Sequence, residues 1–126
     1  MAKTICTLLG VVFLLVGIIG FFSPNLMGTH LTTTHNLVHI ISGLISLYFG
    51  LAGSLSGARG FALAFGAIYL LLGVVGFIMG DAANDRMLSI NALNLMLGTR
   101  DHAVHILLGV LFLIGALATR SDAVAD

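Results

Sequence analysis

The sequence predicts an all-α protein, a polytopic membrane four-helix bundle built from two parallel-repeat helical hairpins. The first observation is composition: of 126 residues, 59% are hydrophobic and 8% are charged, whereas about a quarter of the residues of a soluble domain carry charge. So few charges could not cover the surface of a soluble chain, so lipid is the expected solvent. The second observation is four apolar runs without Asp, Glu, Lys or Arg, at about residues 5–22, 37–53, 61–79 and 103–118. Their lengths approach the roughly 20 residues that a membrane-spanning helix needs.

A sequence repeat supports the same architecture. The segment from Val38 to Ile40, centred on His39, recurs 66 positions later around His105, and a glycine follows each histidine after four positions. Glycines of the first and third runs match at an offset of 56 residues: Gly10, Gly17 and Gly20 with Gly66, Gly73 and Gly76. Each half is therefore one helical hairpin. Equivalent helices run in the same direction, with the pseudo-two-fold axis along the membrane normal.

The first repeat covers residues 5–53. Its first helix is expected to end near Pro24, because proline cannot continue the helical hydrogen-bond ladder. A polar, uncharged connection with His30 leads to the second helix. Small residues recur along that helix at spacings of three and four: Ser42, Gly43, Ser46, Gly50 and Gly53. Such a stripe lets helices approach closely in lipid.

The second repeat covers residues 61–118 and follows a predicted tight turn at residues 54–60. A long loop at residues 80–100 separates its two helices. The centre of this loop, at about residues 87–97, mixes Met, Leu and Ile with two asparagines. We interpret it as a short amphipathic helix on the membrane surface. A polar tail ends the chain, and residues 1–126 form a single membrane domain.

Charge placement predicts the orientation of the helices. Lys3, Arg59 and Arg120 lie on one side of the predicted membrane, and Arg86 and Arg100 lie on the other. The excess of positive residues places both termini in the cytoplasm and the histidine-bearing connections outside. We expect an integral protein of a bacterial inner or photosynthetic membrane. The net charge is zero, so nothing favours a nucleic-acid partner.

Little in the sequence indicates catalysis. The single cysteine, Cys6, cannot form an internal disulfide and is expected to fill space in the first helix. Asp81, Asp85 and Asp101 are interpreted as a solvated loop face. No Ser-His-Asp order, phosphate loop or carboxylate spacing typical of acid–base catalysis is present. We therefore predict no catalytic residues and no enzymatic activity.

Several short motifs point to a known family. They are a Gly-x-x-Gly-Phe that closes the first and third runs, Ala58-Arg59 before the third run, Tyr69 within it, and a polar-x-x-His-x-x-x-Gly that opens the second and fourth runs. In these motifs, over about residues 8–117, the chain resembles a bacterial family of uncharacterised small membrane proteins with four helices, a domain of unknown function. The resemblance implies the bundle and assigns no activity.

The histidines are the candidate functional residues. His35 and His39 are four positions apart, and His102 and His105 are three apart. Each pair shares one helix face if its helix begins early enough. The repeat could then bring the two pairs together.

One hypothesis is axial ligation of a haem or a chlorophyll-type pigment. His39 and His105 would be the axial ligands at equal depth on equivalent helices. Gly43 and Gly109 would leave room beside them for a flat macrocycle.

A second hypothesis is a metal site. Three or four of the imidazoles of His35, His39, His102 and His105 would bind Zn or Cu. Asp101 could orient one of these rings through a hydrogen bond. The simpler interpretation, which the sequence favours, is that the histidines are interfacial caps and donors of hydrogen bonds between helices.

For function, the sequence favours a small accessory or structural subunit that packs against a larger membrane complex or a second copy of itself. Its glycine- and serine-lined faces exceed what four helices need internally. The alternative is the haem- or pigment-binding protein, for electron transfer or light harvesting. A histidine-cluster metal-binding protein is less favoured. A transporter is also less favoured, because no intramembrane charge marks a transport path.

Overall fold

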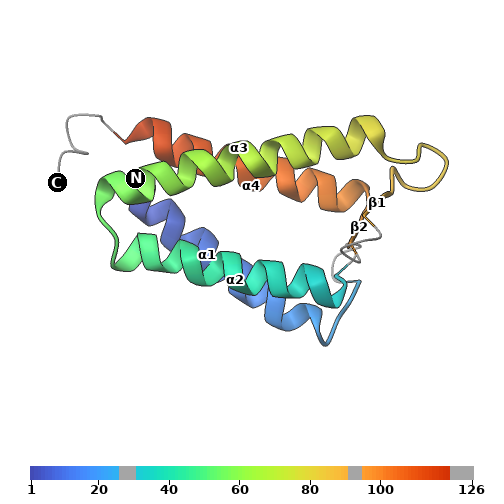
Figure 1. The fold of residues 1–126 in the computed structure, drawn as a ribbon, viewed down its shortest axis with the longest axis horizontal. Coiled ribbons are helices and arrows are strands. Elements are labelled where there is room, and N and C mark those ends of the chain that lie inside the picture. The colour runs from blue at the N-terminus through green and yellow to red at the C-terminus, as the bar shows by residue number, and fades with distance from the viewer. Residues whose placement is uncertain (26–30, 91–94, 120–126) are drawn as a thin grey trace.

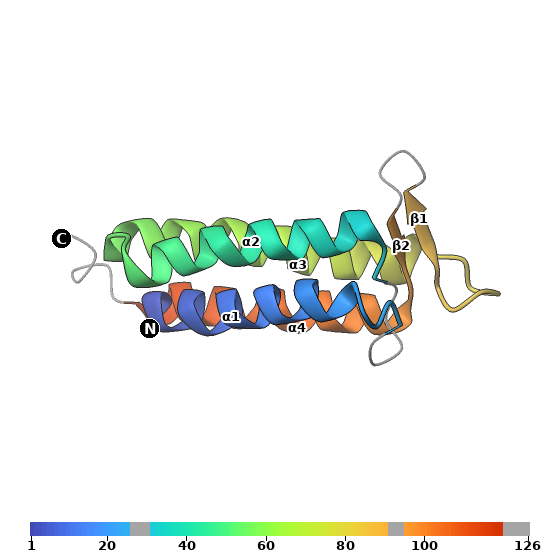
Figure 2. The same ribbon diagram turned by 90° about the horizontal axis from the view of Figure 1, so that it is seen from below.

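The computed structural model describes residues 1–25, 31–90 and 95–119, and its four helices form two antiparallel hairpins (Figure 1). Helix α1 (Ala2–Gly20) pairs with α2 (Thr33–Leu51), and α3 (Leu55–Met79) pairs with α4 (Thr99–Ala118). Helices α1 and α3 run in one direction, whereas α2 and α4 run in the other (Figure 2). Equivalent helices are therefore parallel, as the repeat predicts.

Three of the four helices are long and apolar enough to cross a membrane: α1, α3 and α4. Helix α2 has 19 residues, as α1 does, but it is not among these candidates. Its first turns hold Thr33, Thr34, His35 and Asn36, which lower its hydropathy. Large apolar side chains such as Leu15, Ile68 and Leu71 are exposed on the outer helix faces. The chain is a small helical membrane protein.

Glycines bring the two helices of each hairpin into backbone contact. A Cβ added at Gly43 would lie 2.9 Å from the carbonyl oxygen of Gly10, and one at Gly109 would lie 2.8 Å from that of Gly66. The same Cβ at Gly109 would lie 2.5 Å from the backbone nitrogen of Leu70. The equivalent glycines of the two repeats therefore do the same work, holding α1 on α2 and α3 on α4.

The two hairpins are tied together at the end that holds the termini. The backbone N–H of Ala2, in the first hairpin, donates to Thr119 Oγ1, at the end of the second, at 2.9 Å. Within the second hairpin, Arg59 Nε donates to the carbonyl oxygen of Ala116 at 3.1 Å. Ala2, Ala58 and Ala116 are fully buried there. Small side chains thus allow close approach at this end, where the hairpins lie nearest to each other in Figure 1.

Aromatic side chains fill the middle of the molecule. The rings of Phe13 and Tyr69, which are equivalent at the offset of 56, lie 5.3 Å apart between their centroids. Phe13 also lies 6.1 Å from Phe112. These larger residues separate the hairpins and leave a wider space beyond them, at the end where α2 and α4 begin.

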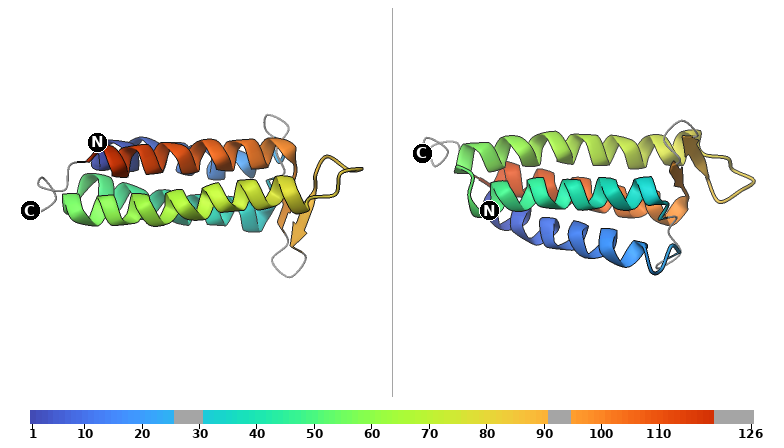
Figure 3. Two further views of the ribbon diagram at one scale, coloured as in Figure 1. Left: turned by 90° about the horizontal axis from the view of Figure 1, so that it is seen from above. Right: turned by 60° about the horizontal axis from the view of Figure 1, so that its bottom comes forward.

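The predicted amphipathic helix at residues 87–97 is wrong. Two short antiparallel strands, β1 (Leu88–Ile90) and β2 (Leu95–Leu97), stand there instead, with Leu88 opposite Leu97. Alternation explains the difference: Ser89 and Met96 are exposed, whereas the residues on either side of each are more buried. This period of two fits a strand rather than a helix. The β-hairpin formed by β1 and β2 lies at the end of the bundle where α4 begins (Figure 3).

All four helices begin before the apolar runs that predict them, at Ala2, Thr33, Leu55 and Thr99. Helix α3 begins at Leu55, because Ser54 Oγ accepts the backbone N–H of Gly57 at 3.0 Å and caps it, so the predicted turn at residues 54–60 is mostly helical. Helix α4 begins at Thr99, which places Asp101 inside its first turn. The predictions for His30, Asn91, Asn94 and Arg120 lie outside the described residues.

Candidate metal-binding site

Two histidines of the site lie on one face of α2. Thr32 caps this helix, and its hydroxyl accepts the backbone N–H of His35 at 3.3 Å. The early start at Thr33 places His35 and His39 one turn apart on the same face. Their ring centroids are 4.3 Å apart, and both side chains are buried.

The third histidine comes from the equivalent position in the second repeat. His105 lies in the second turn of α4 and is 3% exposed. Its ring centroid is 5.9 Å from that of His35. One ring nitrogen from each of His35, His39 and His105 lies within 4.8 Å of the other two. We call these three residues the histidine cluster.

Two of these rings have enclosed nitrogens without partners. Nδ1 of His39 and Nδ1 of His105 are buried and have no hydrogen-bond partner among the described residues. A neutral imidazole has one donor and one acceptor nitrogen, and leaving a buried polar atom unsatisfied costs about 1–3 kcal/mol. A bound ligand at this point would relieve that cost.

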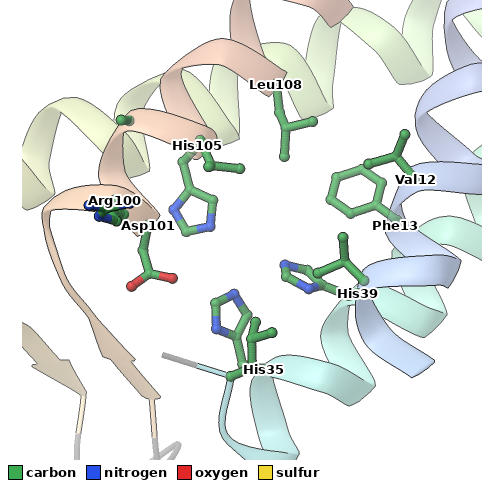
Figure 4. Close-up of a pocket in the computed structure, with 12 residues that line it drawn as sticks. Val12, Phe13, His35, His39, Arg100, Asp101, His105 and Leu108 are labelled. Carbon is green, nitrogen blue, oxygen red and sulfur yellow. The ribbon is translucent and has the colours of Figure 1, made fainter. Parts of the chain in front are cut away.

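The three rings turn toward a common space (Figure 4). The ring of Phe13 closes one side, with its centroid 5.6 Å from that of His39. Tyr69 closes another side, 5.5 Å from His105. The carboxylate of Asp101 lies beside the cluster and interacts electrostatically with His105. The histidine cluster is thus a polar group of side chains bordered by the aromatic rings of Phe13 and Tyr69.

Two cavities meet at the histidine cluster. The larger, of about 400 Å³, is bounded by α1, α2 and α4 and is lined by Val12, Val16, Leu31, Val104 and Leu108, among others. The smaller, of about 230 Å³, lies on the side of α3 and the β-hairpin. All three histidines line both cavities. The cluster is therefore reachable from two sides although its rings are buried.

His102 does not join the other histidines. Its ring is fully buried against Gly76 and Phe77, and Nε2 lies 2.8 Å from the backbone oxygen of Arg86. The offset of 66 explains the error, because it makes His102 equivalent to Asn36 rather than to His35. In the first repeat, Asn36 packs against a glycine in the same manner.

The same offset makes Asp101 the equivalent of His35. Asp101 is 2% exposed, and its Oδ2 accepts the backbone N–H of Gly98 at 2.9 Å, which caps α4. It is therefore not part of the solvated loop face that the sequence predicts. The offset of 66 is the signal that could have placed Asp101 beside the cluster. It has to be applied to every residue of the first motif and not to its histidines alone.

Gly43 and Gly109 do not provide the predicted clearance for a macrocycle. Each faces the other helix of its own hairpin, with Leu14 against Gly43 and Leu70 against Gly109. Their role is to let helices approach. The space beside the histidines comes instead from the separation of the two hairpins.

The geometry of the cluster fits one metal ion. Two nitrogens bound to a tetrahedral zinc at about 2.0–2.1 Å lie about 3.3 Å apart. The ring nitrogens lie within 4.8 Å of one another, so a bound ion would draw them up to about 1.5 Å closer together. Neutral imidazole suits zinc, copper, iron and nickel. Three protein ligands would leave a fourth position open.

The fold and the site define a class: a small helical membrane protein with a buried cluster of histidines at one end of its bundle. The chain belongs to the family described as a domain of unknown function (DUF4383), whose model matches residues 3–118. This match confirms the resemblance seen in the sequence. Comparison with curated proteins and with solved structures found no significant match.

Proposed function

We propose that this membrane protein binds one first-row transition-metal ion, Zn²⁺ or Cu²⁺, through His35, His39 and His105. The observation that carries the proposal is the approach of three ring nitrogens to within 4.8 Å of one another in a buried site. The unpartnered Nδ1 atoms of His39 and His105 support it. Nδ1 of His102, outside the cluster, is also buried without a hydrogen-bond partner among the described residues, so the closeness of the three rings carries the proposal.

The cluster favours a bare ion over a haem or a chlorophyll-type pigment. A macrocycle with His39 and His105 as axial ligands would lie between their rings. Its plane would be perpendicular to the line that joins the two ligands, and it would extend outward from that line on all sides. The ring of His35 occupies that region, 4.3 Å from His39 and 5.9 Å from His105. A third imidazole in this position is useful to a metal ion and obstructs a macrocycle.

The accessory-subunit hypothesis loses its main argument but remains compatible with metal binding. The small residues invoked for it are used inside the molecule: Gly43 and Gly109 pack against neighbouring helices, and Ser46 Oγ donates to the backbone oxygen of Cys6 at 2.7 Å. The outer faces are apolar, as contact with lipid requires. The proposal is one of binding and includes no catalytic step.

Metal titration of the purified protein in a mild non-ionic detergent tests the proposal. The apo protein is titrated with Zn²⁺ and Cu²⁺, and the bound metal is measured by elemental analysis. We expect one ion per chain. Replacing any one of His35, His39 or His105 with alanine should lower the affinity by more than the roughly 10- to 100-fold typical of a residue that only supports a ligand.

The chain offers a matched control in His102, which is also buried in α4 but lies outside the cluster. His102→Ala should keep the wild-type metal stoichiometry. The proposal fails if the wild-type protein binds no ion, or if His102→Ala lowers the affinity as much as the cluster variants do.

A further inference from the structure

The larger cavity has one polar end and long apolar walls. The histidine cluster, Arg100 and Asp101 form the polar end, and the walls are mainly aliphatic side chains, including Val12 and Val16 of α1 and Val104 of α4. Val12 is 42% and Val104 is 43% exposed, and both lie on helices long and apolar enough to cross a membrane. The mouth of the cavity therefore opens between α1 and α4 toward the lipid.

The volume of the cavity is much larger than the open metal position requires. A water molecule occupies about 30 Å³ in the liquid, whereas this cavity measures about 400 Å³. A water or a small anion on the metal would leave most of the walls without contacts. Apolar walls do not hold water well, so an apolar chain is the natural occupant.

The charge at the polar end selects the head group of that occupant. A divalent ion on three neutral imidazoles contributes +2, the buried Asp101 beside His105 contributes −1, and Arg100, which also lines the cavity, contributes +1. The polar end therefore keeps a net positive charge of about +2. An uncompensated charge is costly in a low-dielectric site. An anionic head group on the open position would reduce this charge, and a carboxylate oxygen is a normal zinc ligand.

We propose that this cavity binds a single-chain amphiphile with a carboxylate head group, taken from the bilayer. The carboxylate would occupy the fourth position of the metal, and the chain would lie between α1 and α4. This inference rests on the proposed metal site.

The test uses Co²⁺ in place of zinc, because the visible spectrum of Co²⁺ reports its coordination. The Co²⁺-loaded protein in non-ionic detergent is titrated with decanoate and with acetate, and the change in the Co²⁺ bands is followed. Both anions present the same carboxylate. Decanoate should act at a concentration at least about 100-fold lower, which corresponds to the burial of three to four methylene groups.

Two matched variants of α1 distinguish binding of decanoate in the cavity from its partition into the detergent. Val12→Trp fills the mouth of the cavity without touching a proposed ligand, whereas Leu15→Trp places the same side chain on a lipid-facing position outside it. We expect Val12→Trp to keep the Co²⁺ bands and to lose the advantage of decanoate over acetate. Leu15→Trp should behave as wild type, because decanoate partitions into detergent equally in all three samples.

The outcomes distinguish the two proposals. Absence of Co²⁺ bands in the wild-type protein would remove the metal site, and this inference with it. Normal bands with equal responses to decanoate and acetate would overturn the inference alone and indicate a site for small anions. The inference is also overturned if Val12→Trp responds to decanoate as the wild-type protein does.

Discussion

The glycine contacts inside the hairpins give the sharpest prediction about stability, and Gly109→Ala tests it. A Cβ at this position would lie 2.5 Å from the backbone nitrogen of Leu70 and 2.8 Å from the backbone oxygen of Gly66. Both neighbours are backbone atoms, so no side-chain rotation can relieve the overlap. Helices α3 and α4 would have to move apart.

The magnitude follows from two opposing effects. Overpacking a well-packed contact costs about 1–3 kcal/mol, and the rigid neighbours here place the cost at about 2–3 kcal/mol. Replacing glycine with alanine inside a helix stabilises the helix by up to about 1 kcal/mol. We therefore expect Gly109→Ala to lower the free energy of unfolding by about 1–2 kcal/mol.

Gly60 provides the matched control within the same hairpin. It lies inside α3, and a Cβ there would meet no atom within 4 Å, so Gly60→Ala should be neutral or stabilising. The assay is reversible unfolding in mixed detergent micelles, followed by far-ultraviolet circular dichroism. The reasoning is refuted if Gly109→Ala is as stable as Gly60→Ala.

Three further predictions concern polar contacts. His102→Asn should lose the hydrogen bond to the Arg86 carbonyl and lower the free energy of unfolding by about 1–2 kcal/mol. Amide exchange in the preceding loop should become faster, and the metal stoichiometry should stay unchanged. Ser46→Ala should lose the 2.7 Å bond to the Cys6 carbonyl and lower stability by about 0.6 kcal/mol, measured by the same unfolding assay; no change would contradict the contact. Asp101→Asn keeps an oxygen that can cap α4 but removes the charge beside the histidine cluster, so metal affinity should fall about 10-fold in a titration, and equal affinity would contradict its role.

Much of the fold is predictable from the sequence because it depends on features of short range. Apolar runs predict the helices. Glycines that repeat at an offset of 56 predict equivalent helix faces, and Gly10 and Gly66 do make equivalent contacts. The β-hairpin is not predicted, because a run of Leu, Ser and Ile only three residues long fits either a strand or a helix turn. Pairing of Leu88 with Leu97 is a contact that local composition does not reveal.

The candidate site is predictable in part. The motif repeat predicts that His39 and His105 approach each other, and the four-residue spacing adds His35. The positions of His102 and Asp101 are not given by histidine spacing within one helix. They follow from the offset of 66, which makes His102 equivalent to Asn36 and Asp101 equivalent to His35, so that His102 packs against Gly76 and Asp101 lies beside the cluster.

The most direct test of the metal site is X-ray absorption spectroscopy of the protein loaded with one equivalent of Zn²⁺. We predict three imidazole nitrogens at about 2.0–2.1 Å from the metal, with one imidazole fewer in the His105→Ala variant and no change in the His102→Ala variant. A spectrum with one imidazole or none in the wild-type protein would contradict the proposal that His35, His39 and His105 bind one ion together.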